Sequence, residues 1–170
     1  MSPVTVLITF YSCCGETEKL ALAAAVGAVQ ARAHIRLRRL PDGGAAESMN
    51  ATEDCIATLQ RMHKEYVPPT ESDFASADAL IFAASARTGL APPEWSRCFG
   101  MLEKLHAEGK LEGKVAATLS LGSDAPLAER LLRLGLIVAP PPREEDSVAR
   151  ATNQGRRVAA IARATRLSAH

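Results

Sequence analysis

The chain has 170 residues, 47% hydrophobic and 23% charged, which is enough for one domain with a substantial core. Its 20 basic and 19 acidic side chains leave a formal net charge of +1, which gives no reason to expect nucleic acid or an anionic membrane as a partner. No apolar run approaches the roughly 20 residues of a membrane span, and the N-terminus lacks the layout of a secretory signal. We therefore expect a cytoplasmic protein.

Strand-like and helix-like segments alternate along the whole chain. The apolar run Val4 to Phe10 predicts a buried strand, and the alanine-rich segment Glu18 to Arg32 predicts a helix. In chain order, the later segments predict a half-exposed edge strand at 34–40, a helix at 55–66, a strand at 79–82, a helix at 92–106, a strand at 115–121, a helix at 125–134, a strand at 136–139 and a helix at 146–167. Five strands interleaved with helices indicate a single α/β domain with a doubly wound parallel sheet.

The segment between the first strand and the first helix has the composition of a phosphate-binding loop. Backbone N–H groups, hydroxyls and a helix N-terminus together can hold a phosphate monoester without Lys or Arg. A second interpretation stays open, in which Ser12 and Thr17 only cap the helix. The candidate cofactor-binding residues of this loop are Ser12, Cys13, Cys14, Gly15, Glu16 and Thr17.

Two further loops combine glycine with hydroxyl residues, and each follows a predicted strand. In doubly wound sheets, ligands bind beyond the carboxyl ends of the strands, where the strand order reverses. We therefore expect the loops 11–17, 83–91 and 120–125 to form one site. Arg87 either contacts a cofactor or is a solvated loop charge. The candidate residues of the two later loops are Ser85, Ala86, Arg87, Thr88, Gly89, Ser120, Leu121, Gly122 and Ser123.

The four cysteines are Cys13, Cys14, Cys55 and Cys98, and their spacing does not predict a metal site. As neighbours in sequence, Cys13 and Cys14 are not expected to bridge each other. We expect all four to be reduced thiols. The alternative is a reactive pair at Cys13 and Cys14, since a helix N-terminus lowers the pKa of a thiol.

The chain resembles the WrbA-type flavodoxin-like NAD(P)H:quinone oxidoreductases over nearly its whole length. The family opens with a strand followed by Tyr-Ser-x-x-Gly, and it carries a Gly-Thr-Pro-Thr-Arg-x-Gly motif after the third strand. A Gly-Lys pair precedes its fourth strand, a Ser-x-Gly loop follows that strand, and a Gln-Gly pair lies early in its last helix. The matching segments are Tyr11 to Gly15, Ala83 to Gly89, Gly113-Lys114, Ser120-Leu121-Gly122 and Gln154-Gly155.

This resemblance implies a flavodoxin-like domain over residues 1–170, with a five-stranded parallel sheet in the order 2-1-3-4-5 and helices on both faces. It also implies non-covalent FMN, reduction by NADH or NADPH, and two-electron, ping-pong hydride transfer to a quinone-like acceptor. All the chemistry would then take place on the flavin, without a catalytic side chain or a metal. The resemblance further implies a homodimer or a homotetramer.

Departures from the family pattern keep two other functions open. Ala84-Ser85-Ala86 replaces Thr-Pro-Thr, and Ser123 to Pro126 replaces the glycine-rich end of the third loop. The chain is therefore alternatively a binding or assembly module that has lost FMN. A flavodoxin-type electron carrier is the other alternative, although the near-neutral charge and 4% aromatic content do not favour it.

Two side chains near the nominated loops, Trp95 and Asp124, are candidates for a structural role. Trp95 either covers a flavin ring or packs in the core, as its helical spacing with Phe99 and Leu102 predicts. Asp124 is interpreted as the N-cap of the helix that follows it.

Overall fold

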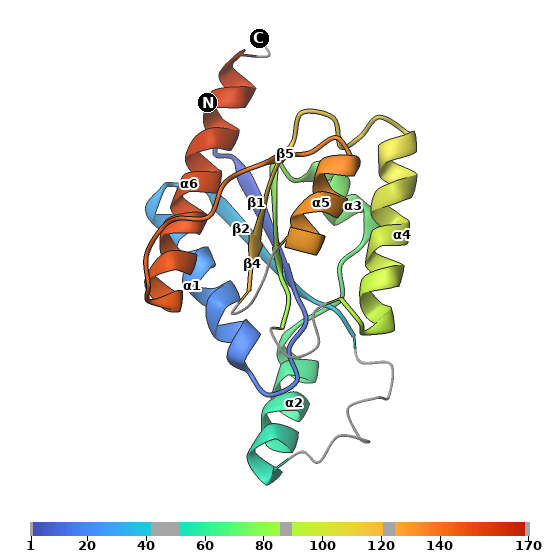
Figure 1. Cartoon of the computed structure of the whole chain (residues 1–170), viewed down its shortest axis with the longest axis vertical. Helices are drawn as coiled ribbons and strands as arrows, with labels where there is room; N and C mark the ends of the chain where they lie inside the picture. The colour runs from blue at the N-terminus through green and yellow to red at the C-terminus, as the bar shows by residue number, and fades with distance from the viewer. Residues whose placement is uncertain (1, 42–51, 86–89, 121–124, 169–170) are drawn as a thin grey trace.

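The central sheet has five parallel strands in the order β2-β1-β3-β4-β5, which confirms the order that the sequence resemblance predicts (Figure 1). The computed structural model describes residues 2–41, 52–85, 90–120 and 125–168. The strands are β1 (Thr5–Phe10), β2 (His34–Arg39), β3 (Ala79–Ala83), β4 (Val115–Leu119) and β5 (Ile137–Val138). Every residue of β3 and β4 is buried, as expected for central strands covered on both faces.

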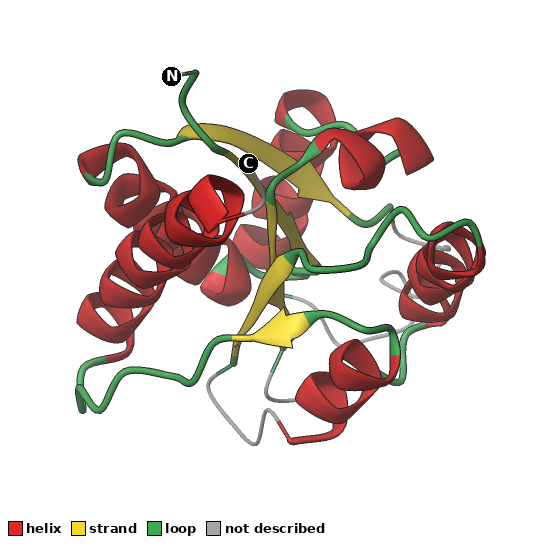
Figure 2. Ribbon diagram, turned by 90° about the horizontal axis from the view of Figure 1, so that it is seen from above, coloured by secondary structure: helices red, strands yellow, loops and turns green. Residues whose placement is uncertain are grey.

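Helices cover both faces of this sheet (Figure 2). One core cluster joins the sheet to α1 and α6, and the other joins it to α3, α4 and α5. Figure 1 shows α2 beyond the carboxyl ends of the strands, next to the turn between β1 and α1. The helices are α1 (Glu16–Gln30), α2 (Glu53–Glu65), α3 (Glu71–Ser76), α4 (Pro93–Ala107), α5 (Ala125–Arg133) and α6 (Ser147–Ser168).

Helices α1 and α6 pack against each other through two glycines. A Cβ atom on Gly27 would lie 1.8 Å from the carbonyl oxygen of Thr152, and one on Gly155 would lie 2.0 Å from the carbonyl oxygen of Ala24. The small-residue face of α1 therefore makes the contact with α6.

The sequence interpretation missed α3, a helix of only six residues. Its start is fixed by a capping box, in which the Thr70 hydroxyl accepts from the Asp73 N–H and the Asp73 carboxylate accepts from the Thr70 N–H. The segment Thr70 to Asp73 carries this signal in its sequence. No helix within the described residues is long and apolar enough to cross a membrane.

Candidate functional site

The three nominated loops begin at the same level of the sheet. The strand register places Phe10 opposite Ala83, and Ala83 opposite Leu119. Hydrogen bonds continue this alignment by one residue, from the Tyr11 N–H to the Ala83 carbonyl and from the Ala84 N–H to the Leu119 carbonyl. The ends of β1, β3 and β4 therefore meet at one edge, as the strand–helix alternation predicts.

The first loop makes a tight turn directly into α1. The Gly15 N–H donates to the Ser12 hydroxyl over 3.0 Å, and Gly15 has a φ of +90°, a left-handed conformation that glycine adopts without a Cβ penalty. Gly15 is also the N-cap of α1, and no side chain caps the helix. Ser12 therefore has a structural role in closing the turn onto the N-cap residue, which is part of what the capping interpretation expects. The N–H groups in the first turn of an α-helix have no acceptor within the helix.

Arg39 adds a positive charge to this corner that the sequence interpretation missed. Its side chain is 3% exposed, and its Nη2 donates to the Ser12 carbonyl over 2.9 Å. The loop was expected to work without arginine, whereas the structure brings Arg39 onto its backbone from the last position of β2. The sequence carries one signal for this role of Arg39: apolar and basic residues alternate along β2 until Arg38 and Arg39, which are adjacent.

Glu18 forms an ion pair between the first turn of α1 and α2. Its carboxylate accepts from Arg61 Nη2 over 2.6 Å and from the Tyr66 hydroxyl over 2.7 Å. Burial raises the pKa of the Glu18 carboxyl, but the bonds from Arg61 and Tyr66 outweigh burial and hold this pKa below its usual range. Arg61 also pairs with Glu65, and Glu16 lies in the same first turn as Glu18, so the two arginines of the corner do not give it a net positive charge.

Cys14 is bonded to Cys55 of α2, and the expectation of four reduced thiols is wrong. The two residues lie 41 positions apart in sequence, with their Cα atoms 4.6 Å apart. Local spacing gives no signal for such a pair, because the fold alone brings α2 to the loop. Cys13 and Cys98 keep free thiols, and burial raises the pKa of Cys98 to about 12. The predicted reactive pair of Cys13 and Cys14 is therefore not present in this state.

The second and third loops are described only where they leave the sheet. Ala84 is buried, Ser85 and Ser120 are half-buried, and both serines have interaction partners. The remaining candidates of these loops, together with Asp124, lie outside the described residues: Ala86, Arg87, Thr88, Gly89, Leu121, Gly122 and Ser123.

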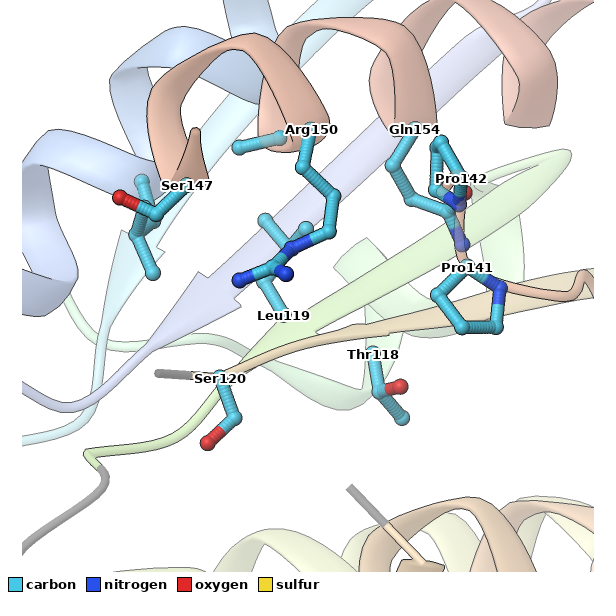
Figure 3. Close-up of a pocket in the computed structure, with 10 residues that line it drawn as sticks. Thr118, Leu119, Ser120, Pro141, Pro142, Ser147, Arg150 and Gln154 are labelled. Atoms are coloured by element: carbon cyan, nitrogen blue, oxygen red, sulfur yellow. The ribbon is translucent and has the colours of Figure 1, made fainter. Parts of the chain in front are cut away.

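A small cavity lies between the end of β4 and the first turns of α6 (Figure 3). Its volume of about 10 Å³ is room for about one water molecule, so it is not itself a substrate pocket. Gln154 lines it, is 1% exposed, and donates through Nε2 to the Ala139 carbonyl over 3.2 Å. Gln154 thus joins α6 to the chain after β5, and Gly155 allows α6 to approach α1. The Gln-Gly pair of the sequence motif has a packing role here.

Three further observations concern Trp95, the Gly-Lys pair and the possibility of a metal site. Trp95 is fully buried and packs against Phe99, so its core interpretation is confirmed and it does not cover a ligand. Lys114, from the Gly-Lys pair, donates through Nζ to the Ala75 carbonyl at the end of α3. In the part of the chain that the structure describes, no group of His, Cys, Asp and Glu side chains is placed to hold a metal ion.

Known proteins resemble this chain in sequence or in fold. No family profile matches the chain. A protein named NAD(P)H dehydrogenase (quinone) from Archaeoglobus fulgidus is 30% identical over 150 residues, which cover 82% of this chain and 78% of that protein. A protein of the same name from Sinorhizobium fredii is 29% identical, and the match covers 78% of this chain but only 63% of its relative.

Among solved structures, a flavodoxin-like, WrbA-like protein from Agrobacterium tumefaciens superposes with a TM-score of 0.64 at 20% identity, over 95% of this chain and 99% of that one. This likeness confirms the flavodoxin-like fold. The sequence match to the archaeal relative adds the family, because it extends over most of both chains. The chain belongs to the WrbA-type family of flavodoxin-like NAD(P)H dehydrogenases (quinone).

Proposed function

We propose that this protein binds FMN and uses it to reduce quinones by two electrons at the expense of NADH or NADPH. The observation that carries the proposal is the corner between β1 and α1, where a helix without a side-chain cap begins at a glycine of φ +90°. Uncapped N–H donors at a helix N-terminus are a favourable site for a phosphate group. The names of the quinone dehydrogenase relatives support the reaction.

The residues of the corner fit a phosphate monoester. Ser12 is 1% exposed and Thr17 is 3% exposed, so neither residue lies in bulk solvent, and the Ser12 hydroxyl accepts from the Gly15 N–H at the turn. Arg39 donates to the Ser12 carbonyl and brings its charge to the loop, which favours an anion at short range. The Glu18 carboxylate is paired with Arg61, which reduces its repulsion of that anion.

When bound, FMN supplies the hydride-transfer chemistry, and the protein positions it. The first loop would hold the phosphate through Ser12, Gly15 and Thr17. The loops after β3 and β4 would approach the ring with backbone donors, which favour negative charge on the reduced ring. Cys13, Cys14, Glu16, Ser85–Gly89 and Ser120–Ser123 complete the proposed cofactor set. We further expect a cytoplasmic homodimer or homotetramer, in keeping with the family resemblance.

A titration of the purified protein with FMN, followed by flavin fluorescence quenching and by the visible spectrum, tests the binding. NADH and NADPH are then compared as donors, with a soluble quinone as acceptor. Replacing Ser12 and Thr17 together by Ala should weaken FMN binding by about 1–3 kcal/mol, the usual cost of lost hydrogen bonds to a charged group. Thr165→Ala is the matched control, because its hydroxyl bonds the Ile161 carbonyl within α6.

Three outcomes are decisive. No flavin bands and no saturable binding would remove the enzyme and leave the binding module. Unchanged affinity in the double variant would place the phosphate elsewhere. Tight FMN binding without quinone reduction by either nucleotide would favour the electron carrier.

A further inference from the structure

The disulfide between Cys14 and Cys55 is placed where it can control the phosphate loop. Cys14 belongs to that loop and is exposed, while Cys55 belongs to the first turns of α2. An exposed disulfide is accessible to a reducing thiol. In reducing compartments, disulfides are usually transient and redox-sensing, so the state of such a pair follows the thiol balance around it.

Helix α2 has few other attachments to the protein. Met62 is its one buried residue, and Arg61 pairs with Glu18 over 2.6 Å. The methyl group of Thr58 lies 3.3 Å from the position of a Cβ on Gly15, so α2 rests directly on the turn that precedes α1. The disulfide, the Arg61–Glu18 pair and the Thr58 contact therefore all join α2 to residues 14–18.

Breaking the disulfide would free the loop and α2 together. A dithiol attacks the Cys14–Cys55 bond; that S–S bond breaks, a new S–S bond forms in the dithiol, and its two electrons and two protons appear as two cysteine thiols. What remains is the buried Met62, Leu59 against the same core, and the bonds of Arg61 and Tyr66 to the buried Glu18 carboxylate. Reduction therefore removes the covalent link between the loop and α2 and leaves non-covalent contacts alone to hold the two segments together.

We propose that the Cys14–Cys55 disulfide is a redox-sensitive clamp on the phosphate loop, which is ordered and binds FMN tightly when the pair is oxidised and binds it weakly when a dithiol has reduced the pair. The proposal rests on the FMN binding proposed above. Its physical basis is preorganisation, because a loop that is already fixed loses less entropy when it binds a ligand.

The test compares the oxidised protein with the same protein reduced by dithiothreitol. Hydrogen exchange of residues 12–18 and 53–65, measured without FMN, reports the clamp itself. The FMN dissociation constant, measured by fluorescence quenching, reports its effect on the ligand. Reduction should speed exchange in both segments and weaken FMN binding at least about fivefold, the lower end of typical coupling between sites.

Two variants on α2 assign the effect. Cys55→Ser should behave as the reduced protein and no longer respond to dithiothreitol. Ile56→Ser, at an exposed neighbour on the same helix, keeps the disulfide and should follow the unmodified protein. Equal exchange and equal affinity in the oxidised and reduced proteins would overturn the clamp. If neither the oxidised nor the reduced protein binds FMN, the proposed function fails, and the control of FMN affinity fails with it. If the protein binds FMN with the same affinity in both states, the clamp alone is refuted.

Discussion

The contact between α1 and α6 makes a sharp prediction about two glycines. In Gly155→Ala, the new methyl group would lie 2.0 Å from the Ala24 carbonyl oxygen, and in Gly27→Ala it would lie 1.8 Å from that of Thr152. Ordinary contacts begin at 3.4 Å, and the opposing atoms belong to helix backbones that have no rotamer to change. The helices must therefore move apart by about 1.5 Å or bend.

Such a separation opens a gap along a buried interface. A gap of 0.5–1 Å already forfeits roughly a quarter to a half of the dispersion energy of a contact. Alanine would by itself favour a helix over glycine by about 1 kcal/mol, but the steric cost outweighs that gain. We expect each variant to lose about 3 kcal/mol or more of unfolding free energy, at the upper end for overpacked cores.

Urea unfolding followed by circular dichroism and by Trp95 fluorescence measures this loss. The matched control is Gly100→Ala, in the exposed face of α4, where a Cβ would have no heavy atom within 4 Å. That variant should gain about 1 kcal/mol from helix propensity. If Gly155→Ala and Gly27→Ala prove as stable as Gly100→Ala, the close crossing of the two helices is refuted.

Three further variants test the corner and the core. Relative to the oxidised protein, Cys55→Ser should lower the unfolding free energy by about 4 kcal/mol, the chain-entropy value for a span of 41 residues. Equal urea unfolding midpoints for the variant and the oxidised parent would contradict this. Glu18→Gln, which breaks the pair with Arg61, should cost about 1–3 kcal/mol at pH 7. Because the folded pKa of Glu18 is depressed, the stability that its carboxylate contributes is present above about pH 4 and fades as the pH falls through the folded pKa. The unfolding free energies of the variant and the parent should therefore converge in acid. A difference that stays constant with pH would argue against this role of Glu18. Thr9→Val should gain about 1 kcal/mol, because the buried Thr9 hydroxyl has no hydrogen-bond partner among the residues that the structure describes. A loss of stability on thermal unfolding would show that the hydroxyl is satisfied.

Local periodicity was sufficient to predict the sheet and most helices. The apolar runs at 4–10 and 115–121 contain β1 and β4, because central parallel strands bury both faces and leave a continuous hydrophobic signal. The predicted fifth strand, 136–139, is reduced to Ile137–Val138. Helix α3 was not predicted because six residues are too few to show a helical hydrophobic periodicity, although its capping box is visible in the sequence.

The candidate site could be predicted only in part. The loop after β1 follows from its composition and its place between a strand and a helix. Arg39 and the Cys14–Cys55 bond do not, because each depends on segments that are distant in sequence and meet only in the folded chain. Long-range pairs of this kind leave no trace in the spacing of a single sequence.

The brevity of β5 determines how the sheet ends. Its two residues pair with Val115 and Ala116, so among the described residues the remainder of β4 has a strand on its β3 side only. After Ala139 the chain continues with Pro140, Pro141 and Pro142, whose nitrogens carry no hydrogen to donate to a neighbouring backbone. An edge strand this short, followed by prolines, offers an incoming peptide too few donors to extend the sheet, so this edge of the sheet is protected against the addition of further strands.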